Sequence, residues 1–373
     1  MTIGVLKEPS HETRVSLLPE AVATLTKKGI EVWVEDGAGE RSYADNQSYI
    51  DAGAEIKSRT EVVAQSAILL GIHSAEPAIQ LNASAIILGV YQPLFNKELV
   101  QSFQSSNVTC FSMDMLPRTT RAQAMDVLSS QANIAGYKAV LTAANLYSRY
   151  FPMFMTAAGS VKPAKLLILG AGVAGLQAIA TGKRLGAVVE VFDTRPAVKE
   201  EVMSLGAKFV EVEGAADASA AGGYAVEQTE DYKRKQQEKI AESIAKADII
   251  ITTAQIPGRK APILVTEEML GTMRNGSVII DLAASTGGNT PFTKNNETIN
   301  HNGVTILGNS NLQGTMPSDA SKLYGKNILN FLQLIIDKEN DINLNWEDDL
   351  VAGSCITHNG EIKNERVKAA ITN

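Results

Sequence analysis

The sequence predicts an α/β protein of two domains with parallel sheets, and three observations support this. Its 373 residues exceed what one ordinary hydrophobic core accommodates. Short runs rich in β-branched residues alternate with helical stretches along most of the chain. Residues 66–72 and 85–91 are almost entirely apolar, which is typical of parallel strands covered on both faces.

The first domain is predicted mainly from the N-terminal residues. Residues 1–7 and 31–35 are expected to form strands, and a helix starts at Pro19, because proline is favoured in the first helical turn. A long helical pattern runs from Arg121 to about Tyr150. We expect this helix to lead into the second domain.

Five strands are expected in the second domain, at 165–169, 187–192, 247–253, 278–282 and 304–307. A second long helix, at 318–337, would lead the chain back. The prediction is therefore two domains joined by two long helices. Residues 1–130 and 325–373 form the first domain, and residues 131–324 form the second.

The composition excludes several classes of function. The net charge is −7 and there is no basic cluster, which argues against a nucleic-acid partner. The two cysteines, Cys110 and Cys355, lack metal-ligand spacing, so no metal site is expected. The N-terminus has no signal-peptide pattern, and no apolar run reaches the roughly 18 residues of a membrane-spanning helix. We therefore expect a cytoplasmic chain that does not itself insert into a membrane.

The most informative motif is Gly170-Ala171-Gly172-Val173-Ala174-Gly175, between the strand 165–169 and a helical stretch. In this pattern the first glycine permits a tight turn, and the second lets the backbone approach a pyrophosphate. The third lets the helix pack on the strand, and the pyrophosphate then lies on the helix N-terminus. The motif predicts a dinucleotide-binding, Rossmann-like domain, and a tight turn in an unrelated βα sheet is the alternative.

The second strand of this domain ends at Asp193, at about the 20-residue distance expected for the acid that binds the ribose hydroxyls. Its carboxylate would repel a 2′-phosphate, which favours NAD(H) over NADP(H). Thr194 and Arg195 follow directly and belong to the predicted site. Arg195 has two interpretations, a partner for a 2′-phosphate or a solvated surface charge.

The richest polar cluster begins at Arg118. Gln123, Asp126, Ser129 and Ser130 recur at spacings of three and four, which predicts one shared helix face. An amide, a carboxylate and hydroxyls on one face could hold a nicotinamide carboxamide and ribose, while Arg118 could reach a phosphate or pair with Asp126. A helix cap with a solvated face is the alternative.

Two further residues have two interpretations each. Arg14, in the charged loop 7–15, could bind a substrate carboxylate or form a surface salt bridge. His73 follows a buried strand, where either a catalytic base or a structural histidine would fit. No nucleophile elbow, metal site or paired-carboxylate catalyst is found. Hydride transfer would explain this, because it needs two reactants held face to face in a dry site.

Taken together, these residues resemble one family, the NAD(H)-binding alpha subunit (domain I) of proton-translocating NAD(P) transhydrogenase. The resemblance covers essentially the whole chain. Besides the motifs above, it includes residues 7–15, 136–139, 222–225, 281–284 and 357–361. Arg118, Gln123, Asp126 and Ser129 match the family's nicotinamide-side loop. Gly223, Tyr224 and Ala225 match a mobile loop that closes over bound nucleotide.

The resemblance implies a reversible hydride transfer between NAD(H) on this chain and NADP(H) on a partner subunit, coupled to proton translocation across a membrane. Arg118, Gln123 and Asp126 would be its catalytic residues. It also implies two Rossmann-like domains and a homodimer. The chain would lie on the inner face of the cell membrane, held by membrane-spanning subunits that include an NADP(H)-binding domain.

One position departs from the family pattern, because Ser285 stands where an acidic residue is usual in the Asp-Leu-Ala-Ala-x-Thr-Gly-Gly segment. The first alternative function is that of the related alanine dehydrogenases. Their lysine, histidine and aspartate fall in regions that here read Gly-Ile-His73, Tyr91-Gln-Pro and Ser285. The second alternative is a non-catalytic NAD-binding module.

Overall fold

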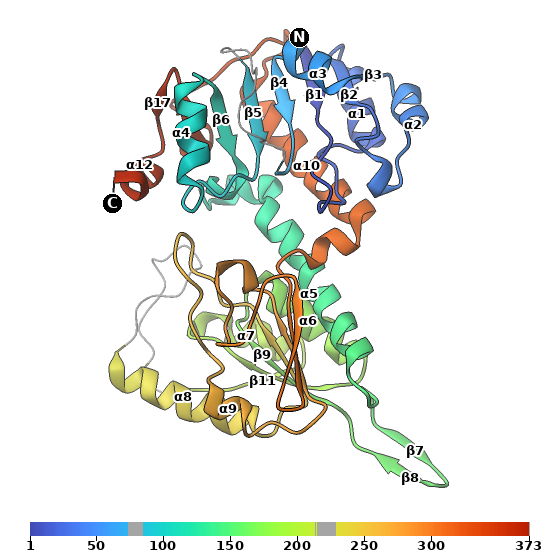
Figure 1. Ribbon diagram of the computed structural model, residues 1–373, viewed down its shortest axis with the longest axis vertical. Coiled ribbons are helices and arrows are strands. Elements are labelled where there is room, and N and C mark those ends of the chain that lie inside the picture. Colours follow the sequence, from blue (N-terminus) through green and yellow to red (C-terminus); the bar gives the residue numbers. More distant parts are fainter. Residues whose placement is uncertain (74–84, 213, 215–228, 373) are drawn as a thin grey trace. The chain divides into compact units, whose positions relative to one another are not determined.

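The computed structural model describes residues 1–73, 85–212, 214 and 229–372 (Figure 1). It divides into two compact units, unit 1 with Met1–Gln131 and Gly314–Asn373, and unit 2 with Ala132–Gln313. The chain leaves unit 1 within helix α5 (Val127–Leu146) and returns just before α10 (Pro317–Ile335). The boundary between residues 324 and 325 that the sequence suggested falls inside α10.

The sheet of unit 1 contains β1 (Thr2–Val5), β2 (Glu31–Glu35), β3 (Glu55–Lys57), β4 (Ile68–Leu70), β5 (Ile86–Gly89), β6 (Thr109–Ser112), β16 (Cys355–His358) and β17 (Glu361–Ile362). Their order is β17-β16-β6-β5-β4-β1-β2-β3. The strands β1 to β6 are all parallel, which confirms the predicted parallel sheet. The strands β16 and β17 extend it in antiparallel fashion, which the sequence did not predict.

The helices of unit 1, besides α10, are α1 (Pro19–Thr26), α2 (Asn46–Asp51), α3 (Arg59–Gln65), α4 (Lys97–Ser105), α11 (Asp349–Ser354) and α12 (Glu365–Thr372). Successive residues of β4 point to opposite faces of the sheet. Ile68 and Leu70 pack in the core that contains Tyr324 of α10. Leu69 packs on the other face, with Phe103 of α4. This double cover explains why the strand is apolar throughout.

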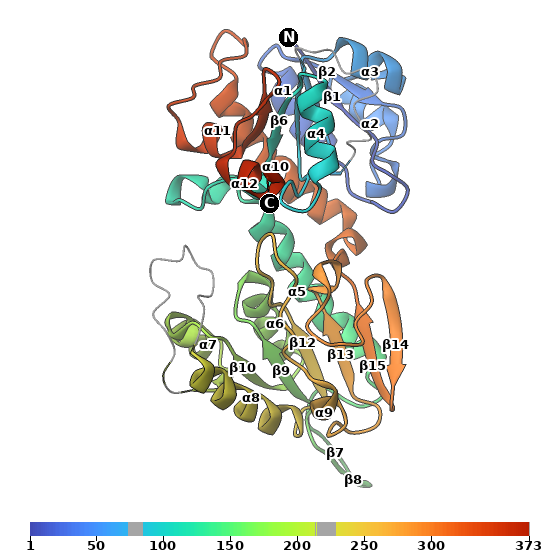
Figure 2. The ribbon, with the colours of Figure 1, turned by 60° about the vertical axis from the view of Figure 1, so that its left-hand side comes forward.

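The sheet of unit 2 contains β9 (Lys165–Leu169), β10 (Val188–Phe192), β11 (Lys208–Phe209), β12 (Ile249–Thr252), β13 (Val278–Asp281), β14 (Glu297–His301) and β15 (Val304–Gly308). Their order is β11-β10-β9-β12-β13-β15-β14, and β14 alone is antiparallel among the described strands of this sheet (Figure 2). Both sheets therefore place their first strand, β1 or β9, between the second and the fourth, the order of a Rossmann fold.

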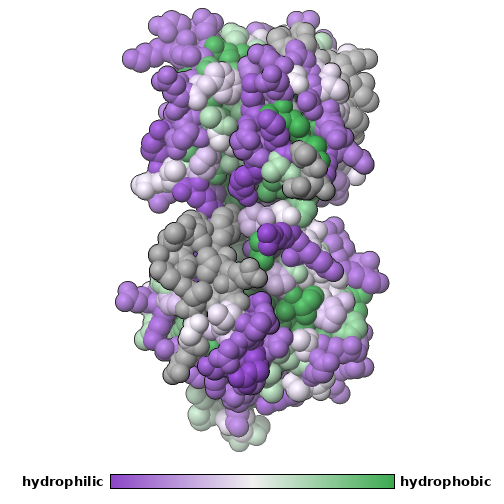
Figure 3. Space-filling view, turned by 90° about the vertical axis from the view of Figure 1, so that its left-hand side faces the viewer, coloured by the Kyte–Doolittle hydropathy of each residue, from purple (hydrophilic) through white to green (hydrophobic). Residues whose placement is uncertain are grey.

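The helices of unit 2, besides most of α5, are α6 (Val173–Arg184), α7 (Lys199–Ser204), α8 (Glu230–Ile244) and α9 (Glu267–Leu270). Alternate residues of β9 again serve two cores. Leu166 packs with Ile179 of α6, and Leu167 packs with Ile244 of α8 on the opposite face. The outer surface over α8 is hydrophilic (Figure 3), as its charged sequence predicts.

A separate two-stranded sheet, β7 (Phe154–Thr156) and β8 (Gly159–Val161), projects from unit 2 (Figures 1 and 2). All residues of both strands are exposed. Tyr150 stacks on Phe154 beside the hairpin, with ring centroids 5.0 Å apart. The sequence did not predict this hairpin.

The described ranges leave out residues 74–84, 213, 215–228 and 373. Within them, no helix combines the length and the apolar character needed to cross a bilayer. The same residues contain no group of three or more His, Cys, Asp or Glu side chains arranged to hold a metal ion.

Candidate functional site

The glycine loop of unit 2 connects β9 to α6, and its three glycines have three different surroundings. Gly170 has φ +108°, a conformation that residues with a side chain rarely adopt. A Cβ atom on Gly172 would meet no other atom within 4 Å, so this position is open. A Cβ atom on Gly175 would collide with the carbonyl group of Gly170. The tight turn, the open approach and the close packing of helix on strand are therefore all present.

The N-terminus of α6 has the features of an anion-binding site. Gly172 precedes the helix and no side chain caps it. Val173 is exposed and Ala174 is partly exposed, so the N–H groups of the first turn face an accessible region. On the other side, a Cβ atom on Gly136 of α5 would collide with the backbone of Ala174. Glycine at position 136 thus lets α5 pack directly on the first turn of α6.

Asp193 follows β10 and its carboxylate is bonded within the chain. Oδ2 accepts the N–H of Ala171 in the glycine loop at 2.7 Å. Oδ1 accepts the backbone N–H of Arg195 at 2.8 Å, and Nε and Nη2 of Arg195 donate to Oδ1 and Oδ2. The acid thus fixes the start of the glycine loop, and Thr194 lies half-buried between the two charged residues.

The interpretation of Arg195 as a solvated surface charge is wrong. Its side chain is only 19% exposed and forms an ion pair with Asp193 at 2.8 Å. The hydrogen bond to Asp193 raises the pKa of the Arg195 guanidinium above its ordinary value, despite the opposing effect of burial. The guanidinium thus lies against both oxygens of Asp193.

Two loops beside the glycine loop contain polar contacts that the sequence motifs did not reveal. Thr253, after β12, donates its hydroxyl hydrogen to the carbonyl of Gly170 at 3.1 Å. Asn289 donates to the carbonyls of Ala254 and Pro262, so it ties the loop after β12 to the loop after β13. The signal for such contacts was weak, because Thr253 is a single polar side chain 83 positions away from Gly170 in the chain.

Asp281 ends β13, and Ser285 lies in the loop that follows. Asp281 is fully buried and accepts the N–H groups of Ala283 and Asn289 and the hydroxyl of Thr293, so it organises the loop. Ser285 is exposed, and its backbone N–H donates to the hydroxyl of Ser310 at 2.7 Å. The position that departs from the family pattern thus places a short hydroxyl side chain on the surface.

In unit 1 the structure contradicts the prediction that Gln123, Asp126, Ser129 and Ser130 share one helix face. Residues Thr120–Met125 form a 3₁₀ helix, η3, and α5 begins only at Val127. Asp126 lies at the junction, where its Oδ1 accepts the N–H of Ser129 at 2.9 Å and its Oδ2 accepts the hydroxyl hydrogen at 2.6 Å. Asp126 therefore caps α5, because Ser129 is the third residue of the helix. The alternative of a helix cap is confirmed for this residue.

The other predicted residues of this segment differ in exposure. Arg118 and Gln123 are exposed, whereas Ser129 and Ser130 are half-buried. Ala122, on η3, is buried and belongs to the core of unit 1. The segment thus presents an amide and a guanidinium at the surface from a turn that is anchored underneath.

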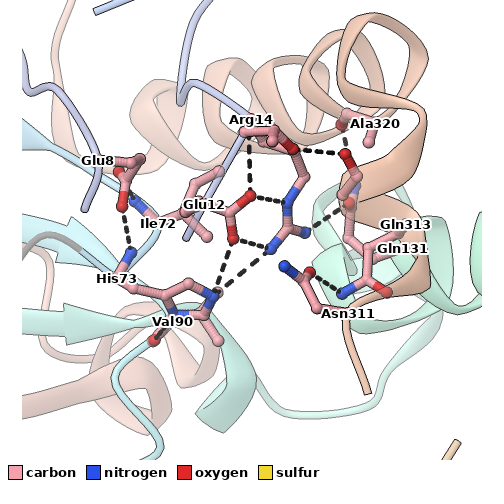
Figure 4. Close-up of polar contacts among 12 residues, drawn as sticks. Glu8, Glu12, Arg14, Ile72, His73, Val90, Gln131, Asn311, Gln313 and Ala320 are labelled. Atoms are coloured by element: carbon pink, nitrogen blue, oxygen red, sulfur yellow. Dashed lines mark hydrogen bonds and ion pairs between the residues drawn. The ribbon is translucent and has the colours of Figure 1, made fainter. Parts of the chain in front are cut away.

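A buried charged cluster lies at the carboxyl ends of β1 and β4 in unit 1 (Figure 4). Nε and Nη2 of Arg14 donate to the two carboxylate oxygens of Glu12 at 2.8 and 2.6 Å. Nη1 of Arg14 donates to Oε1 of Gln131, in the second turn of α5, at 2.8 Å. Arg14 is only 4% exposed, so the interpretation as a surface salt bridge is wrong. All three of its guanidinium nitrogens donate to residues of its own chain.

The two carboxylates of this cluster have opposite pKa shifts. Burial would raise the pKa of Glu12, but hydrogen bonds from Arg14 and His73 outweigh it and hold the pKa far below its ordinary value. Burial raises the pKa of Glu8 above its ordinary value, although the N–H groups of Ile72 and His73 donate to it. Glu12 is therefore the stable anion that pairs with Arg14.

His73 joins the same cluster through its ring. Its Nδ1 lies 3.2 Å from the carbonyl oxygen of Val90, and a carbonyl can only accept, so Nδ1 carries the hydrogen. Nε2 lies 3.4 Å from both Nη2 of Arg14 and Oε2 of Glu12. The ring is thus held between two elements of unit 1, which supports the structural interpretation of this histidine. Gly223, Tyr224 and Ala225 of the predicted mobile loop lie outside the described residues.

Comparison with known protein families gives two matches that follow each other along the chain. Residues 4–135 match the N-terminal domain of the alanine dehydrogenase/PNT family, and residues 139–365 match its C-terminal domain. Together they cover the charged loop after β1 and the glycine loop of unit 2.

Individual relatives agree with this result. The chain is 43% identical to an NAD(P) transhydrogenase alpha subunit of Rhodospirillum rubrum, over 97% of each chain. It is 26% identical to the alanine dehydrogenase of Staphylococcus saprophyticus, over all of this chain and 97% of the relative. The crystal structure of transhydrogenase from Sinorhizobium meliloti superimposes with a TM-score of 0.88, at 43% identity, over 97% of this chain and all of the other. The chain belongs to the alanine dehydrogenase/PNT family, within which it resembles the alpha subunits of NAD(P) transhydrogenase.

Proposed function

We propose that this chain is the NAD(H)-binding subunit of a proton-translocating NAD(P) transhydrogenase. In this role it exchanges hydride between its own NAD(H) and NADP(H) held by a partner subunit, and the exchange is coupled to proton translocation through membrane-spanning subunits. The observation that carries the proposal is the glycine loop, in which Gly170, Gly172 and Gly175 have the conformation, openness and packing of a pyrophosphate-binding turn. The 43% identity to a transhydrogenase alpha subunit indicates the reaction class.

The proposed nucleotide-binding residues of unit 2 divide by role. The N–H groups of the first turn of α6, at Val173 and Ala174, would bind the pyrophosphate. Asp193 would accept the hydroxyls of the adenosine ribose once Arg195 releases one of its oxygens, with Thr194 beside it. Gly223, Tyr224 and Ala225 would close over the bound nucleotide.

The residues proposed for the nicotinamide end are Arg118, Gln123, Asp126 and Ser129. Hydride transfer between two nicotinamides requires no acid or base from the protein, so their task is to orient the ring. The exposed amide of Gln123 offers a donor and an acceptor to a carboxamide. Asp126 is already fixed by Ser129, and Arg118 provides a positive charge for a phosphate.

Replacing Gln123 by asparagine tests the orienting role. The side chain is shortened by one methylene, which keeps the amide but moves it by about an ångström, so hydride transfer should slow by about 100-fold. NADH binding, measured by titration of NADH fluorescence, should change far less. An equal loss in binding and in transfer would contradict the orienting role.

The quaternary arrangement is also included in the proposal. The chain would form a homodimer, located in the cytoplasm and held on the inner face of the cell membrane by its membrane-spanning partners. The β7–β8 hairpin supports a dimer, because a two-stranded hairpin alone is marginally stable in water. Its exposed apolar side chains are Phe154, Met155 and Val161, and the exposed Tyr150 and Met153 precede it in the chain.

Sedimentation of the purified chain tests the dimer. Met155→Asp should convert it to a monomer, because Met155 is 74% exposed on the hairpin. Met203→Asp is a matched control, since Met203 is 57% exposed elsewhere on unit 2 and should leave the dimer intact. A wild-type chain that sediments as a monomer would contradict the dimer but not the reaction.

The decisive experiment for the function uses the partner subunits. Purified chain should bind NADH, and it should exchange hydride with NADP⁺ only when the NADP(H)-binding partner is added. Binding without any transfer would favour a non-catalytic NAD-binding module. Steady NADH production from alanine by the chain alone would instead favour an alanine dehydrogenase. Arg14 already donates to Glu12 and Gln131. These contacts argue against Arg14 as the binding residue for a substrate carboxylate, and therefore against alanine dehydrogenase activity.

A further inference from the structure

We infer that Asn327, on α10 of unit 1, is a positioning residue for Gln123 and Asp126. Its side-chain amide holds both the η3 turn and the first turn of α5 against α10. The inference deepens the proposed function, and it rests on that function only where it concerns hydride transfer. The positioning itself can be tested in the free chain.

The geometry of the amide is unambiguous. Nδ2 of Asn327 donates to the carbonyl oxygen of Ala124 at 2.8 Å, and Oδ1 accepts the hydroxyl of Ser130 at 2.7 Å. The carbonyl of Ala124 can only accept, so the nitrogen must face it and the oxygen must face Ser130. One side chain therefore bonds to residues on either side of Asp126.

The part of α10 that carries Asn327 is held in the core of unit 1. Asn327 is only 7% exposed, and its neighbours Tyr324, Ile328 and Phe331 on α10 are fully buried in the core of unit 1. Its bonds to Ala124 and Ser130 are partly buried, so water competes for them less effectively than for a fully exposed bond. Loss of the amide would leave the carbonyl of Ala124 with the exposed Asn330 as its side-chain partner.

The other polar contacts of η3 are at the surface. Nδ2 of Asn330 donates to the same carbonyl of Ala124 at 3.0 Å, but Asn330 is exposed. Arg121 pairs with Asp348 at 2.6 Å, and the Arg121 side chain is 58% exposed. Exposed ion pairs and exposed hydrogen bonds contribute little, because water competes for both partners. Asn327 is therefore the buried polar anchor of this turn.

The hydrogen bonds of Asn327 hold backbone segments that directly adjoin Gln123 and Asp126, two residues of the proposed nicotinamide site. Gln123 directly precedes Ala124 and is exposed, so the direction of its side chain follows from the backbone rather than from packing. Asp126 caps α5 through Ser129, which directly precedes Ser130. A displacement of η3 by about an ångström would move both groups, and such displacements cost hydride transfer about 100-fold when they misplace a reactant.

A second tie between α5 and α10 does not involve Asn327. Nε2 of Gln131 donates to the carbonyl of Ala320 at 3.0 Å, and Gln131 in turn accepts from Arg14. This contact is buried and should hold the start of α5 when Asn327 is replaced. The effect of such a replacement should therefore be local to η3 and its junction with α5.

Hydrogen exchange in the free chain tests the positioning. The amides of Ala122 and Asp126 are bonded within η3, to the carbonyls of Thr119 and Gln123, and report its stability. Asn327→Leu, which is nearly isosteric but has no polar atoms, should speed their exchange about tenfold, because the turn opens locally. Asn330→Leu is a matched replacement one turn along the same helix, and it should leave the exchange rate of these amides close to that of wild type. Unchanged exchange in Asn327→Leu, or equal acceleration in both variants, would overturn the inference.

Hydride transfer in the assembled complex provides the functional readout. Asn327→Leu should lower the transfer rate about 10- to 100-fold and change NADH affinity far less, whereas Asn330→Leu should change neither. A rate equal to wild type in Asn327→Leu, or a parallel loss of rate and affinity, would overturn the inference. Absence of any transfer by the wild-type complex would instead refute the proposed function, and the exchange experiment would still decide on the positioning.

Ser130→Ala keeps the test valid should Asn327→Leu not fold. It removes the donor to Oδ1, together with the contacts of the same hydroxyl with the carbonyl of Val127 and the amide of Gln131, and leaves the bond from Asn327 to Ala124 in place. The exchange of Asp126 should then accelerate by a smaller factor than in Asn327→Leu, and the thermal midpoint should stay near that of wild type. No change at Asp126 in Ser130→Ala would overturn the inference.

Discussion

The loops that follow the first strand of each sheet, β1 in unit 1 and β9 in unit 2, occupy the same place in the strand order and differ in nearly every other respect. The loop after β9 is a short glycine turn that leaves the N-terminus of α6 uncapped. The loop after β1 runs from residue 6 to residue 18 without a glycine, and it places Glu8, Glu12 and Arg14 in the interior.

The difference teaches how one architecture supports two tasks. At this point of an open α/β sheet, neighbouring loops diverge and backbone N–H groups are free to bind a ligand. In unit 1 the carboxylate of Glu8 accepts the N–H groups of Ile72 and His73, so a side chain of the chain itself satisfies them. In unit 2 the N–H of Ala254, at the corresponding place after β12, is likewise bonded, by Oδ1 of Asn289, whereas no side chain caps the first turn of α6 after the glycine loop. Four experiments can break or sharpen this comparison.

The largest effect is expected for Arg14→Met. The substitution leaves the carboxylate of Glu12 buried without its cation, which should lower the free energy of unfolding by about 3–5 kcal/mol. Urea denaturation measures this loss. The double variant Glu12→Gln, Arg14→Met should recover much of it, because no charge then remains buried. Lost NADH affinity without lost stability would place Arg14 in the nucleotide site and break the comparison.

A smaller loss of stability is expected for Gly175→Ala, and a specific loss of binding for Gly172→Ala. The first adds a methyl group against the carbonyl of Gly170 and should cost about 1–3 kcal/mol of stability. The second adds it in open space, so folding should persist while NADH binding weakens about tenfold, or about 1.4 kcal/mol. Thermal unfolding and NADH titration separate the two. Full NADH affinity in Gly172→Ala would show that the nucleotide does not approach this backbone.

The next effect concerns selectivity. Asp193→Ala should weaken NADH binding by about 1.5 kcal/mol and reduce the discrimination against NADPH, since the repelling carboxylate is lost. It also removes the acceptor for Ala171, so binding is compared at temperatures where the variant is fully folded. Arg195→Ala is the companion variant, because it removes the guanidinium from both oxygens of Asp193. Unchanged discrimination in Asp193→Ala would show that selectivity resides elsewhere.

The smallest effect is a difference in acid sensitivity. The pKa of Glu12 is lowered by folding from its ordinary 4.5. Its contribution to stability is therefore complete above that pH and is lost as the pH falls through the lowered value. Glu12→Gln alone should therefore flatten the loss of stability in acid. In the background Arg14→Met the buried carboxylate has no cation and burial should raise its pKa, so acid should stabilise that variant and Glu12→Gln should remove this reversed dependence. Identical pH profiles for wild type and Glu12→Gln would contradict the assignment of Glu12 as the paired anion.

Much of the fold was predictable because its parallel strands are covered on both faces. Apolar runs such as 66–72 predicted β4, and Pro19 correctly marked the start of α1. The antiparallel additions β14 and β17 were missed, because edge strands are partly exposed and lack a continuous apolar pattern. The β7–β8 hairpin was missed since its residues belong to no core of their own unit.

The candidate site was only partly predictable, for related reasons. The glycine loop could be read because each glycine is required by local backbone geometry. The spacing of three between Asp126 and Ser129 fits a cap as well as a helix face, so the sequence alone could not separate the two. The burial of Arg14 depends on Gln131, which is 117 residues away in the chain, and no local pattern encodes such a contact.

Because Asp126 caps α5, substitutions at this position in a mutational scan change the stability of the helix as well as the charge at the proposed site. Alanine at a helix N-cap costs about 1 kcal/mol of stability, whereas asparagine caps about as well as aspartate. In a screen that scores activity alone, almost every substitution of Asp126 would lower the amount of folded protein. The proposed effect on the rate of hydride transfer could not be separated from that loss. Asp126→Asn is the exception, since it retains an acceptor for the N–H of Ser129 and removes the negative charge together with the acceptor of the Ser129 hydroxyl. Abundance and activity, scored together at this one codon, would separate the effect of the charge from that of the helix.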